Sequence, residues 1–248
     1  MQVSVILLAA GLGQRMGAAV NKIWLPLAGK PLLQYSLEFF ARASQVSQII
    51  AVAHAGELEQ IERLIAELPA ELQGKAGLVV EGGSTRLRSV AAALPYISCT
   101  ADLVAVHDTA RPLLGQADWQ AVLAAAARPD YLGAILAAPV TDTIKLLPKA
   151  VAQAEPGRLL GPIEGSPPRE LLWRALTPQV FAIEPFIEAY SRMDKDFTDD
   201  AALLAASVRG QVALVSGSAD NIKITTPRDL QLAELILAEK AGGDAPCA

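Results

Sequence analysis

The chain has 248 residues, of which 52% are hydrophobic and 19% charged, and its formal net charge at pH 7 is −5. Burial of this much apolar surface offsets the entropy lost on folding, which excludes a mainly disordered chain and leaves one large α/β domain or two small ones. The acidic balance argues against nucleic acid as a partner, and no polybasic cluster points to an anionic membrane surface.

Short apolar runs alternate with helical patterns over the first half of the chain. In chain order we expect a strand over Val3–Ala9, a helix over Pro31–Ala43, a strand over Gln48–Ala53, a helix over Glu57–Leu68, a strand over Leu78–Glu81, a helix over Arg88–Leu94, a strand over Leu103–His107, a helix over Ala117–Ala127 and a strand over Leu132–Ala138. Strands separated by helices imply right-handed parallel crossovers and a layered α/β sheet. Ligands on such sheets lie beyond the carboxyl ends of the strands, so the loops after residues 9, 81, 107 and 138 are the candidate site.

The pattern breaks between Lys145 and Pro178, where prolines are frequent and no helix is predicted before Glu170. A disordered insertion, a lid and an extended arm that packs on a partner subunit all fit this stretch, with disorder and the arm favoured equally. Regular structure is expected to return with Asp199–Ser207, followed by a strand over Gln211–Val215 and a final helix from Pro227. The composition of Ala241–Ala248 predicts a loose tail.

The apolar run Val3–Ala10 is interpreted as a buried strand rather than a signal peptide, because no Lys or Arg precedes it and a glycine-rich segment follows at once. No segment reaches the roughly 18–20 apolar residues that a membrane span needs. Cys99 and Cys247 are far apart and form no CxxC pair, which argues against structural zinc and a disulfide framework. We therefore expect a cytoplasmic location.

The glycine-rich segment reads Ala9-Ala10-Gly11-Leu12-Gly13-Gln14-Arg15-Met16-Gly17. Glycines here let the backbone approach an anion and direct N–H groups at phosphate oxygens, although a tight turn alone would also explain them. The dinucleotide fingerprint needs glycine at Met16, and a Walker loop needs a Gly-Lys-Ser or Gly-Lys-Thr that does not occur. Arg15 inside the turn and Lys22 after it suit a polyphosphate, although Lys22 alone would be an ordinary solvated lysine.

Three further segments carry polar residues, namely Gly82–Val90, His107–Pro112 and Ala219–Thr225. The first suits a base or ribose, or simple helix capping by Ser84 or Thr85. In the second, Asp108 suits a ribose, a metal ion or a substrate hydroxyl, and Arg111 a phosphate, unless the two form a pair that only shapes the loop. His107, with no partner in sight, is interpreted as structural. Lys223 in the third lies in a strand-like run, where a lysine is normally a surface residue.

Together these segments resemble one family. The run Leu8-Ala9-Ala10-Gly11-x-Gly13-x-Arg15-Met16-Gly17, followed by Lys22, is similar to the signature of nucleotide-sugar pyrophosphorylases. The runs His107–Pro112, Ala138–Lys145, Leu176–Gln179 and Asp220–Lys223 narrow the resemblance to 2-C-methyl-D-erythritol 4-phosphate cytidylyltransferases of the non-mevalonate isoprenoid pathway. The similarity extends from Val3 to the final helix, and the later runs are more specific than the first.

The resemblance implies a reaction that joins the acceptor's phosphate to CMP from CTP and releases diphosphate, and it assigns roles by position. The catalytic residues would be Arg15, Lys22, Arg169 and Lys223. CTP would be held by Ala9, Ala10, Gly11, Gly13, Gly83, Arg86, Ser89 and Thr109. The acceptor, a small polyol phosphate, would be held by Asp108, Arg111 and Thr143, with Arg169 and Lys223 aiming it.

The residue types agree with this chemistry. A phosphate monoester has a second pKa of about 6, so the nucleophile is already ionised at neutral pH and needs no general base. The obstacle is the approach of two anions, which cations and a divalent metal counteract. Mg²⁺ is expected to be held mainly by the CTP phosphates, with Asp108 as a further ligand at most.

The resemblance also implies a single Rossmann-like layered domain over residues 1–240, with a mostly parallel twisted sheet, and a flexible tail over 241–248. In the family an arm around positions 140–170 crosses to a second subunit, so an extended β-arm in a homodimer is preferred over disorder. Three places depart from the family pattern: Thr109 replaces Ala or Gly, Ser84 and Arg88 stand where other polar or acidic residues are common, and Pro167-Pro168 precede Arg169.

Other functions remain as alternatives. A related cytidylyltransferase would use another acceptor, such as ribitol 5-phosphate. A nucleotide-binding regulator or an inactive homologue is disfavoured because Arg15, Lys22 and Lys223 are all present. A nicotinamide-dependent oxidoreductase is disfavoured by Met16.

Overall fold

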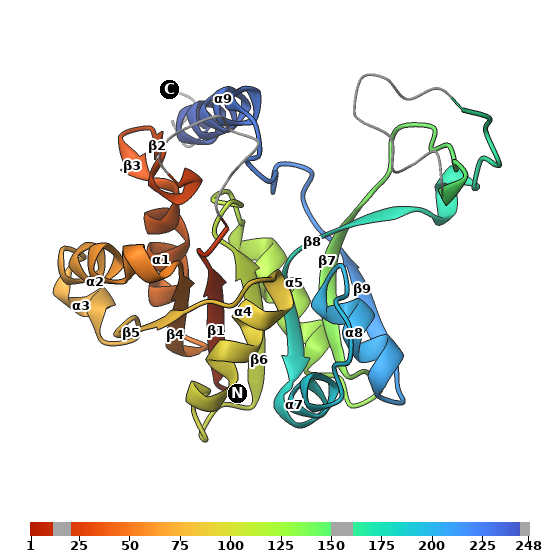
Figure 1. Cartoon of the computed structure of the whole chain (residues 1–248). Helices are drawn as coiled ribbons and strands as arrows, with labels where there is room; N and C mark the ends of the chain where they lie inside the picture. Colours follow the sequence, from red (N-terminus) through yellow and green to blue (C-terminus); the bar gives the residue numbers. More distant parts are fainter. Residues whose placement is uncertain (12–20, 150–160, 244–248) are drawn as a thin grey trace.

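A computed structural model describes residues 1–11, 21–149 and 161–243. They fold around a seven-stranded sheet of order β5-β4-β1-β6-β8-β7-β9 (Figure 1). Its strands are β1 (Val3–Leu8), β4 (Val46–Ala53), β5 (Leu78–Glu81), β6 (Leu103–Asp108), β7 (Gly133–Pro139), β8 (Trp173–Ala182) and β9 (Val212–Ser216). Neighbouring strands are parallel except that β8 runs antiparallel to both β6 and β7. The mostly parallel α/β sheet expected from the sequence is confirmed.

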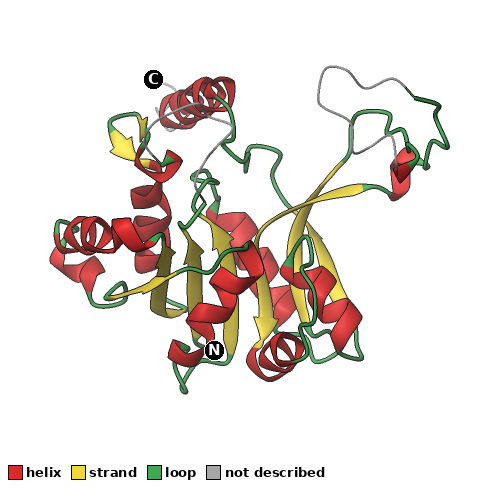
Figure 2. Ribbon diagram, in the orientation of Figure 1, coloured by secondary structure: helices red, strands yellow, loops and turns green. Residues whose placement is uncertain are grey.

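Helices cover both faces of this sheet (Figure 2). They are α1 (Leu32–Arg42), α2 (Leu58–Ala66), α3 (Ala70–Gln73), α4 (Arg86–Ala93), α5 (Gln116–Ala126), α7 (Ile183–Ser191), α8 (Asp200–Ser207) and α9 (Pro227–Gly243). Short 3-10 helices cover Lys22–Trp24, Ala55–Glu57, Leu94–Tyr96 and Arg169–Leu171, and a small hairpin joins β2 (Pro26–Leu27) to β3 (Lys30–Pro31).

Alternate residues of β1 enter two different cores. Val5 and Leu7 pack with Phe40 of α1 and Trp119 of α5, all of them fully buried. Ile6 belongs to a second cluster, which the helices α4, α7 and α8 close from the other face. Because successive side chains of a strand point to opposite faces, a strand covered on both sides is mostly apolar, and in β1 the buried Ser4 is the polar exception. This explains why β1 was recognisable as a continuous apolar run.

The prediction of irregular structure up to Pro178 is wrong for the last part of this stretch. Most of β8 lies inside it, and α7 follows where no regular structure was predicted before Asp199. A proline normally argues against a strand within a sheet, since it cannot donate to the ladder. Here the β7–β8 pairing has an irregularity between Ile135 and Ala137, opposite Pro178, and the ladder resumes on either side.

Two smaller predictions at the end of the chain also need correction. The run Ala219–Thr225 is a loop and not a strand, although Ile224 N donates a hydrogen bond to Ala110 O at 2.8 Å. The helix α9 continues to Gly243, so the expected loose tail does not begin at Ala241, and residues 244–248 lie outside the described chain. On α9, Leu230, Ala233 and Ile236 pack in a third core cluster.

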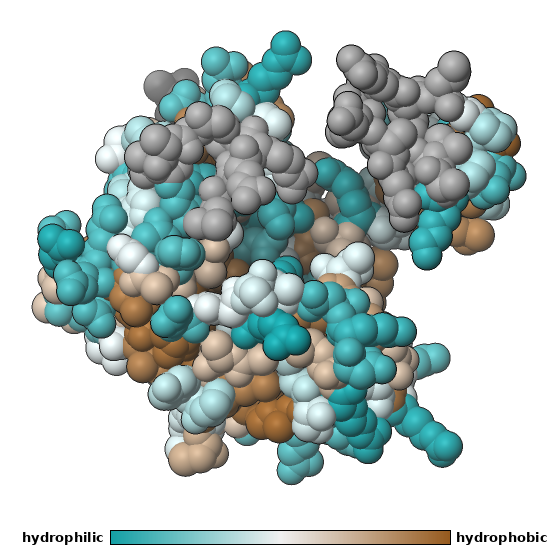
Figure 3. Space-filling view, viewed as in Figure 1, coloured by the Kyte–Doolittle hydropathy of each residue, from teal (hydrophilic) through white to brown (hydrophobic). Residues whose placement is uncertain are grey.

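The strands β7 and β8 continue beyond the sheet into an arm, of which residues 140–149 and 161–172 are described. Val140 N donates to Leu172 O at 3.1 Å, and an isolated bridge joins Leu146 to Gly165. The arm stands out from the body of the molecule (Figure 3). The described part of the arm is therefore extended, and its use in a dimer stays a prediction. Among the described residues, no helix is both long and apolar enough to cross a membrane.

Candidate functional site

A cavity of about 710 Å³ opens where the parallel strands β1, β4, β5 and β6 end. Its lining includes eight of the residues singled out from the sequence, namely Ala10, Gly11, Lys22, Gly83, Arg86, Ser89, Asp108 and Lys223. Carboxyl ends of parallel strands are where ligands bind in open α/β sheets, because the connecting loops diverge there. Gly13 and Arg15 lie outside the described residues.

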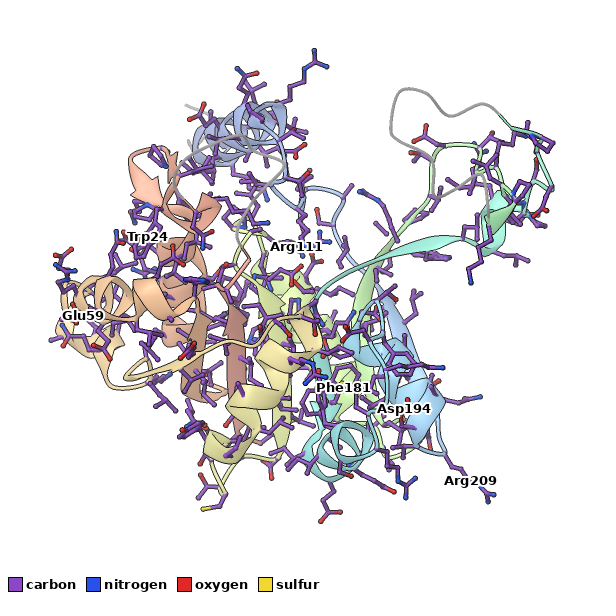
Figure 4. The ribbon with its side chains drawn as sticks, in the orientation of Figure 1. Trp24, Glu59, Arg111, Phe181, Asp194 and Arg209 are labelled. Carbon is purple, nitrogen blue, oxygen red and sulfur yellow. The ribbon has the colours of Figure 1, made fainter. Side chains whose placement is uncertain are left out.

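The turn that carries Lys22 is held by a carboxylate from another part of the chain. Glu57 accepts hydrogen bonds from Asn21 Nδ2 at 2.8 Å and from Trp24 Nε1 at 2.9 Å. Asn21 Nδ2 also donates to Ala9 O at 3.2 Å, at the end of β1. Hydrogen bonds to a carboxylate are stronger than those between neutral groups, so Glu57 holds the side chains of Asn21 and Trp24 on both sides of Lys22. Figure 4 shows Trp24 and Arg111 at the same end of the sheet.

The second glycine segment leaves no room for side chains. A Cβ on Gly82 would lie 2.8 Å from Ala10 Cβ, and one on Gly83 would lie 2.5 Å from Arg88 Cβ. Ser89 Oγ accepts a hydrogen bond from Gly83 N at 3.2 Å and donates to Thr85 O at 2.9 Å. Thr85 caps α4 by accepting from Arg88 N, which confirms the capping alternative for this residue. The loop beside the cavity is thus fixed by its own backbone and by Ser89.

Asp108 lies between two cations at the end of β6. Its Oδ2 is 2.6 Å from Lys223 Nζ, and its Oδ1 is 3.7 Å from Arg86 Nε. Burial alone would raise the pKa of Asp108, but Lys223 and then Arg86 outweigh it and hold the pKa well below the ordinary value. The carboxylate therefore stays ionised at neutral pH. Lys223 is placed by its neighbour Ile224, which is fully buried in the third core cluster.

Arg111 and Thr109 lie outside the cavity lining. Arg111 donates to Asn221 O at 2.7 Å and to Ala175 O at 3.4 Å, so it anchors the loop of Lys223 and does not pair directly with Asp108. Thr109 is buried, and its hydroxyl donates to Leu8 O at 2.7 Å, which ties β6 to β1. Both side chains are engaged with backbone carbonyls.

His107 is structural, as interpreted from the sequence. Its ring is buried, with Nδ1 3.1 Å from Thr177 Oγ1 and Nε2 3.2 Å from Arg111 O. Burial lowers the pKa of His107 to about 4, since the charged form loses its hydration. The imidazole is therefore neutral at neutral pH and connects β6, β8 and the loop of Arg111.

The sequence did not single out Asp200, at the first position of α8. Its Oδ2 is 2.7 Å from Arg86 Nη2, and its Oδ1 accepts a hydrogen bond from the Tyr190 hydroxyl. Asp199 caps the same helix through Ala202 N, and acidic residues are common in the first turn of helices. The local pattern therefore explains both acids as capping, and nothing in it indicates the pairing with Arg86.

Two further predicted residues, Thr143 and Arg169, lie on the arm, and the last one, Ala9, is fully buried and lies outside the cavity lining. Thr143 is exposed, and Arg169 Nη1 donates to Thr141 O at 2.9 Å. Neither lines the cavity of its own chain. Within the described residues, no group of three or more His, Cys, Asp or Glu is arranged to hold a metal ion.

Comparison with known proteins agrees with this geometry. The model of the 2-C-methyl-D-erythritol 4-phosphate cytidylyltransferase family matches residues 3–239. The protein of that name from Rhodopirellula baltica is 41% identical over 252 residues, covering 96% of this chain and 95% of its own length. The one from Symbiobacterium thermophilum is 38% identical over 242 residues, covering 96% and 94%. The crystal structure of the one from Thermus thermophilus matches with a TM-score of 0.71 at 34% identity, over 96% of this chain and 100% of that chain.

Proposed function

The chain belongs to the 2-C-methyl-D-erythritol 4-phosphate cytidylyltransferase family, and from that premise we infer how its cavity carries out the reaction. It is a nucleotidyltransferase that moves the cytidylyl group of CTP to 2-C-methyl-D-erythritol 4-phosphate, a step of isoprenoid precursor synthesis. The observation that carries the inference is the cluster of Lys223, Asp108 and Arg86 at the end of β6, in a cavity also lined by Lys22 and Gly11.

The reaction requires that one side of the cavity bind the triphosphate of CTP. An oxygen of the acceptor phosphate attacks the α-phosphorus of CTP, the bond from that phosphorus to the bridging oxygen breaks, and diphosphate leaves with the electron pair. Ala9–Gly13 with Arg15 and Lys22 are proposed to hold the triphosphate, where their charges offset the charge gathering on the leaving diphosphate. The ionised acceptor phosphate needs no base, which agrees with the neutral, buried state of His107.

The opposite side of the cavity is proposed to hold the base, the ribose and the acceptor. The backbone of Gly82 and Gly83 allows a base to approach closely because neither residue has a side chain. Ser89 shapes that loop, and Arg86 lies at its end. Asp108 suits a hydroxyl of the acceptor, and Lys223 its phosphate. Thr109 and Arg111 are proposed to act from behind the lining, by fixing β6 and the loop of Lys223.

Magnesium is proposed to arrive with CTP and to be held mainly by its phosphates. The lining offers two carboxylates, Asp108 and Glu81. Asp108 Oδ1 makes a longer contact, 3.7 Å to Arg86 Nε, so it retains a lone pair that suits a hard cation. When bound, the ion would supply positive charge against the phosphates. We therefore propose that Asp108 is the ligand that the protein supplies to the ion, and that a few waters complete its coordination.

The arm is proposed to pair with a second copy of the chain. Apolar residues are exposed on it, namely Ile144, Leu146, Ile163 and Leu171, and Trp173 is exposed next to it at the start of β8. Exposed apolar clusters of this kind mark contact surfaces. Since Thr143 and Arg169 do not line their own cavity, the arm would bring them to the partner's cavity. The cytoplasmic location expected from the sequence stays a prediction.

Complementation between inactive variants tests the arm directly. Arg169→Ala and Lys223→Ala are each expected to lose turnover, and a co-expressed mixed dimer should regain activity because one of its two sites then keeps both residues. With random pairing, about a quarter of the wild-type rate is expected, since half of the dimers are mixed. If Arg169 acted in its own chain, no mixture would regain activity. Light scattering on the same samples would report whether the dimer forms.

Turnover with a defined acceptor tests the function itself. The protein, CTP, Mg²⁺ and 2-C-methyl-D-erythritol 4-phosphate should release diphosphate, and ribitol 5-phosphate in a parallel assay should give a much lower rate. Folded protein that released no diphosphate with the first acceptor would refute the proposal. A faster reaction with ribitol 5-phosphate would keep the chemistry and change the acceptor.

A further inference from the structure

A fully buried carboxylate holds a cavity-lining arginine from behind. Asp200 has no exposed surface and does not line the cavity, yet its Oδ2 lies 2.7 Å from Arg86 Nη2. The Arg86 side chain is 26% exposed and does line the cavity. Removing a carboxylate from water is costly unless its charge is paired, and Arg86 supplies a positive charge in contact with it.

Three elements fix the position of Asp200. Tyr190 of α7 donates its hydroxyl to Asp200 Oδ1. Gln179 of β8 donates to Asp199 Oδ2 at 3.0 Å and accepts from Ala201 N at 3.2 Å, which fixes the first turn of α8. The carboxylate thus belongs to the rigid body of the sheet, and the guanidinium it holds has little freedom to turn.

Acidic and basic side chains alternate in a row, in the order Asp200, Arg86, Asp108 and Lys223. Burial lowers the pKa of Arg86, but Asp200 and then Asp108 outweigh it and raise the pKa above the ordinary value. Arg86 therefore stays charged, and two carboxylates compete for it. Without Asp200, Arg86 would move toward Asp108 or toward an incoming triphosphate, because either is then its nearest counter-charge.

We propose that Asp200 is a positioning residue, which holds Arg86 in place when the anionic substrates enter and so keeps Asp108 and Lys223 aligned for the acceptor. The proposal rests on the proposed function and extends it to a side chain that touches no substrate. Groups held in advance need no reorganisation during the reaction, so the effect falls on turnover as well as on binding.

A double-mutant cycle tests the proposal. Asp200→Asn keeps the shape of the side chain and removes its charge, and we expect it to lower kcat/KM about 10-fold or more in the native background. In an Arg86→Met background the same change should lower it by no more than about 2-fold, because the residue through which Asp200 acts is gone. An equal loss in both backgrounds, or full activity in folded Asp200→Asn, would overturn the proposal.

Folding is monitored in the same experiment. Glu38 is a matched control, since this carboxylate is also largely buried and paired with Lys30 and Arg42, but lies outside the cavity lining. Glu38→Gln should lower the melting temperature and leave kcat/KM within about 2-fold in both backgrounds. If Asp200→Asn alone does not fold, the Asp200→Asn/Arg86→Met double variant removes both charges and is compared with Arg86→Met and Arg86→Lys.

Failure of the positioning role of Asp200 can be distinguished from failure of the proposed function. If the wild type releases no diphosphate from any acceptor, the proposed function fails. The same cycle is then measured on CTP binding by calorimetry, where Asp200→Asn and Arg86→Met should again be non-additive. Additive effects on binding would overturn the positioning role independently of turnover.

Discussion

Lys223 Nζ lies 2.6 Å from Asp108 Oδ2, although 115 positions of the chain separate the two residues. Their contact joins the end of β6 to the loop before α9. It places one positive and one negative group on the same wall of the cavity, where an acceptor bearing hydroxyls and a phosphate would meet both.

Replacing Lys223 by Met should lower kcat/KM for the acceptor by about 100-fold or more, because the phosphate loses a charged contact in the transition state and Asp108 loses its nearer partner. CTP binding without acceptor should change by less than about 3-fold. Steady-state kinetics with each substrate varied, together with calorimetry, measures the two effects. A loss confined to CTP binding would contradict the assignment of Lys223 to the acceptor.

Glu57→Gln should lower kcat about 3- to 10-fold, since the amide cannot accept from both Asn21 and Trp24 and the turn that carries Lys22 loosens. Glu59→Gln is the matched control. Glu59 is exposed on α2, and its backbone carbonyl, which the substitution keeps, accepts from Arg63 Nε at 3.3 Å (Figure 4 labels Glu59). Equal rates for the two variants would show that Glu57 does not position Lys22.

Gly83→Ala should weaken CTP binding about 10-fold or more. The new Cβ would lie 2.5 Å from Arg88 Cβ and 2.9 Å from the Arg88 carbonyl carbon, so the loop or the start of α4 must shift. Gly77→Ala serves as the control, because nothing lies within 4 Å of a Cβ there. Calorimetric titration with CTP compares the two, and unchanged affinity in Gly83→Ala would remove this loop from the nucleotide site.

The stability of the protein should fall as the pH drops from about 6.5 toward 4, in part through His107. Its folded pKa of about 4 lies below the ordinary 6.5, so the unfolded chain binds a proton in this window that the folded chain does not. The stabilisation is fully present above pH 6.5 and amounts to about 3 kcal/mol at most. Urea unfolding of His107→Gln should depend less on pH in this window than that of His54→Gln, in which the exposed histidine is changed.

The low pKa of Asp108 affects the stability of the protein at a lower pH than that of His107 does. Its stabilisation is present above the unfolded value of about 4 and is lost as the pH falls further. Any acid limb of kcat/KM near pH 6 should therefore come from the acceptor phosphate and persist in His107→Gln.

Local sequence patterns determined many of the strands and helices of this protein and part of its candidate site. The alternation of apolar strands and amphipathic helices from Val3 to Pro139 is visible in the sequence, because strands buried on both faces are mostly apolar and helices show a 3.6-residue period. Glycine pairs and strand ends then indicated much of the cavity lining, including Gly83 and Asp108, whereas Lys223 was indicated by the family resemblance and not by its local pattern. A strand's end predicts a loop at the ligand-binding edge whatever the rest of the chain does.

Tertiary structure alone decided the rest. The strand β8 contains Pro178 and runs antiparallel between β6 and β7, an insertion that depends on the order of the sheet and not on any local period. That insertion turns Arg111 toward backbone carbonyls and places α7 and α8 beside α4, so that Asp200 meets Arg86. Ion pairs between residues far apart in the chain leave no periodic signal, because the sequence records each partner's type and not the distance between them.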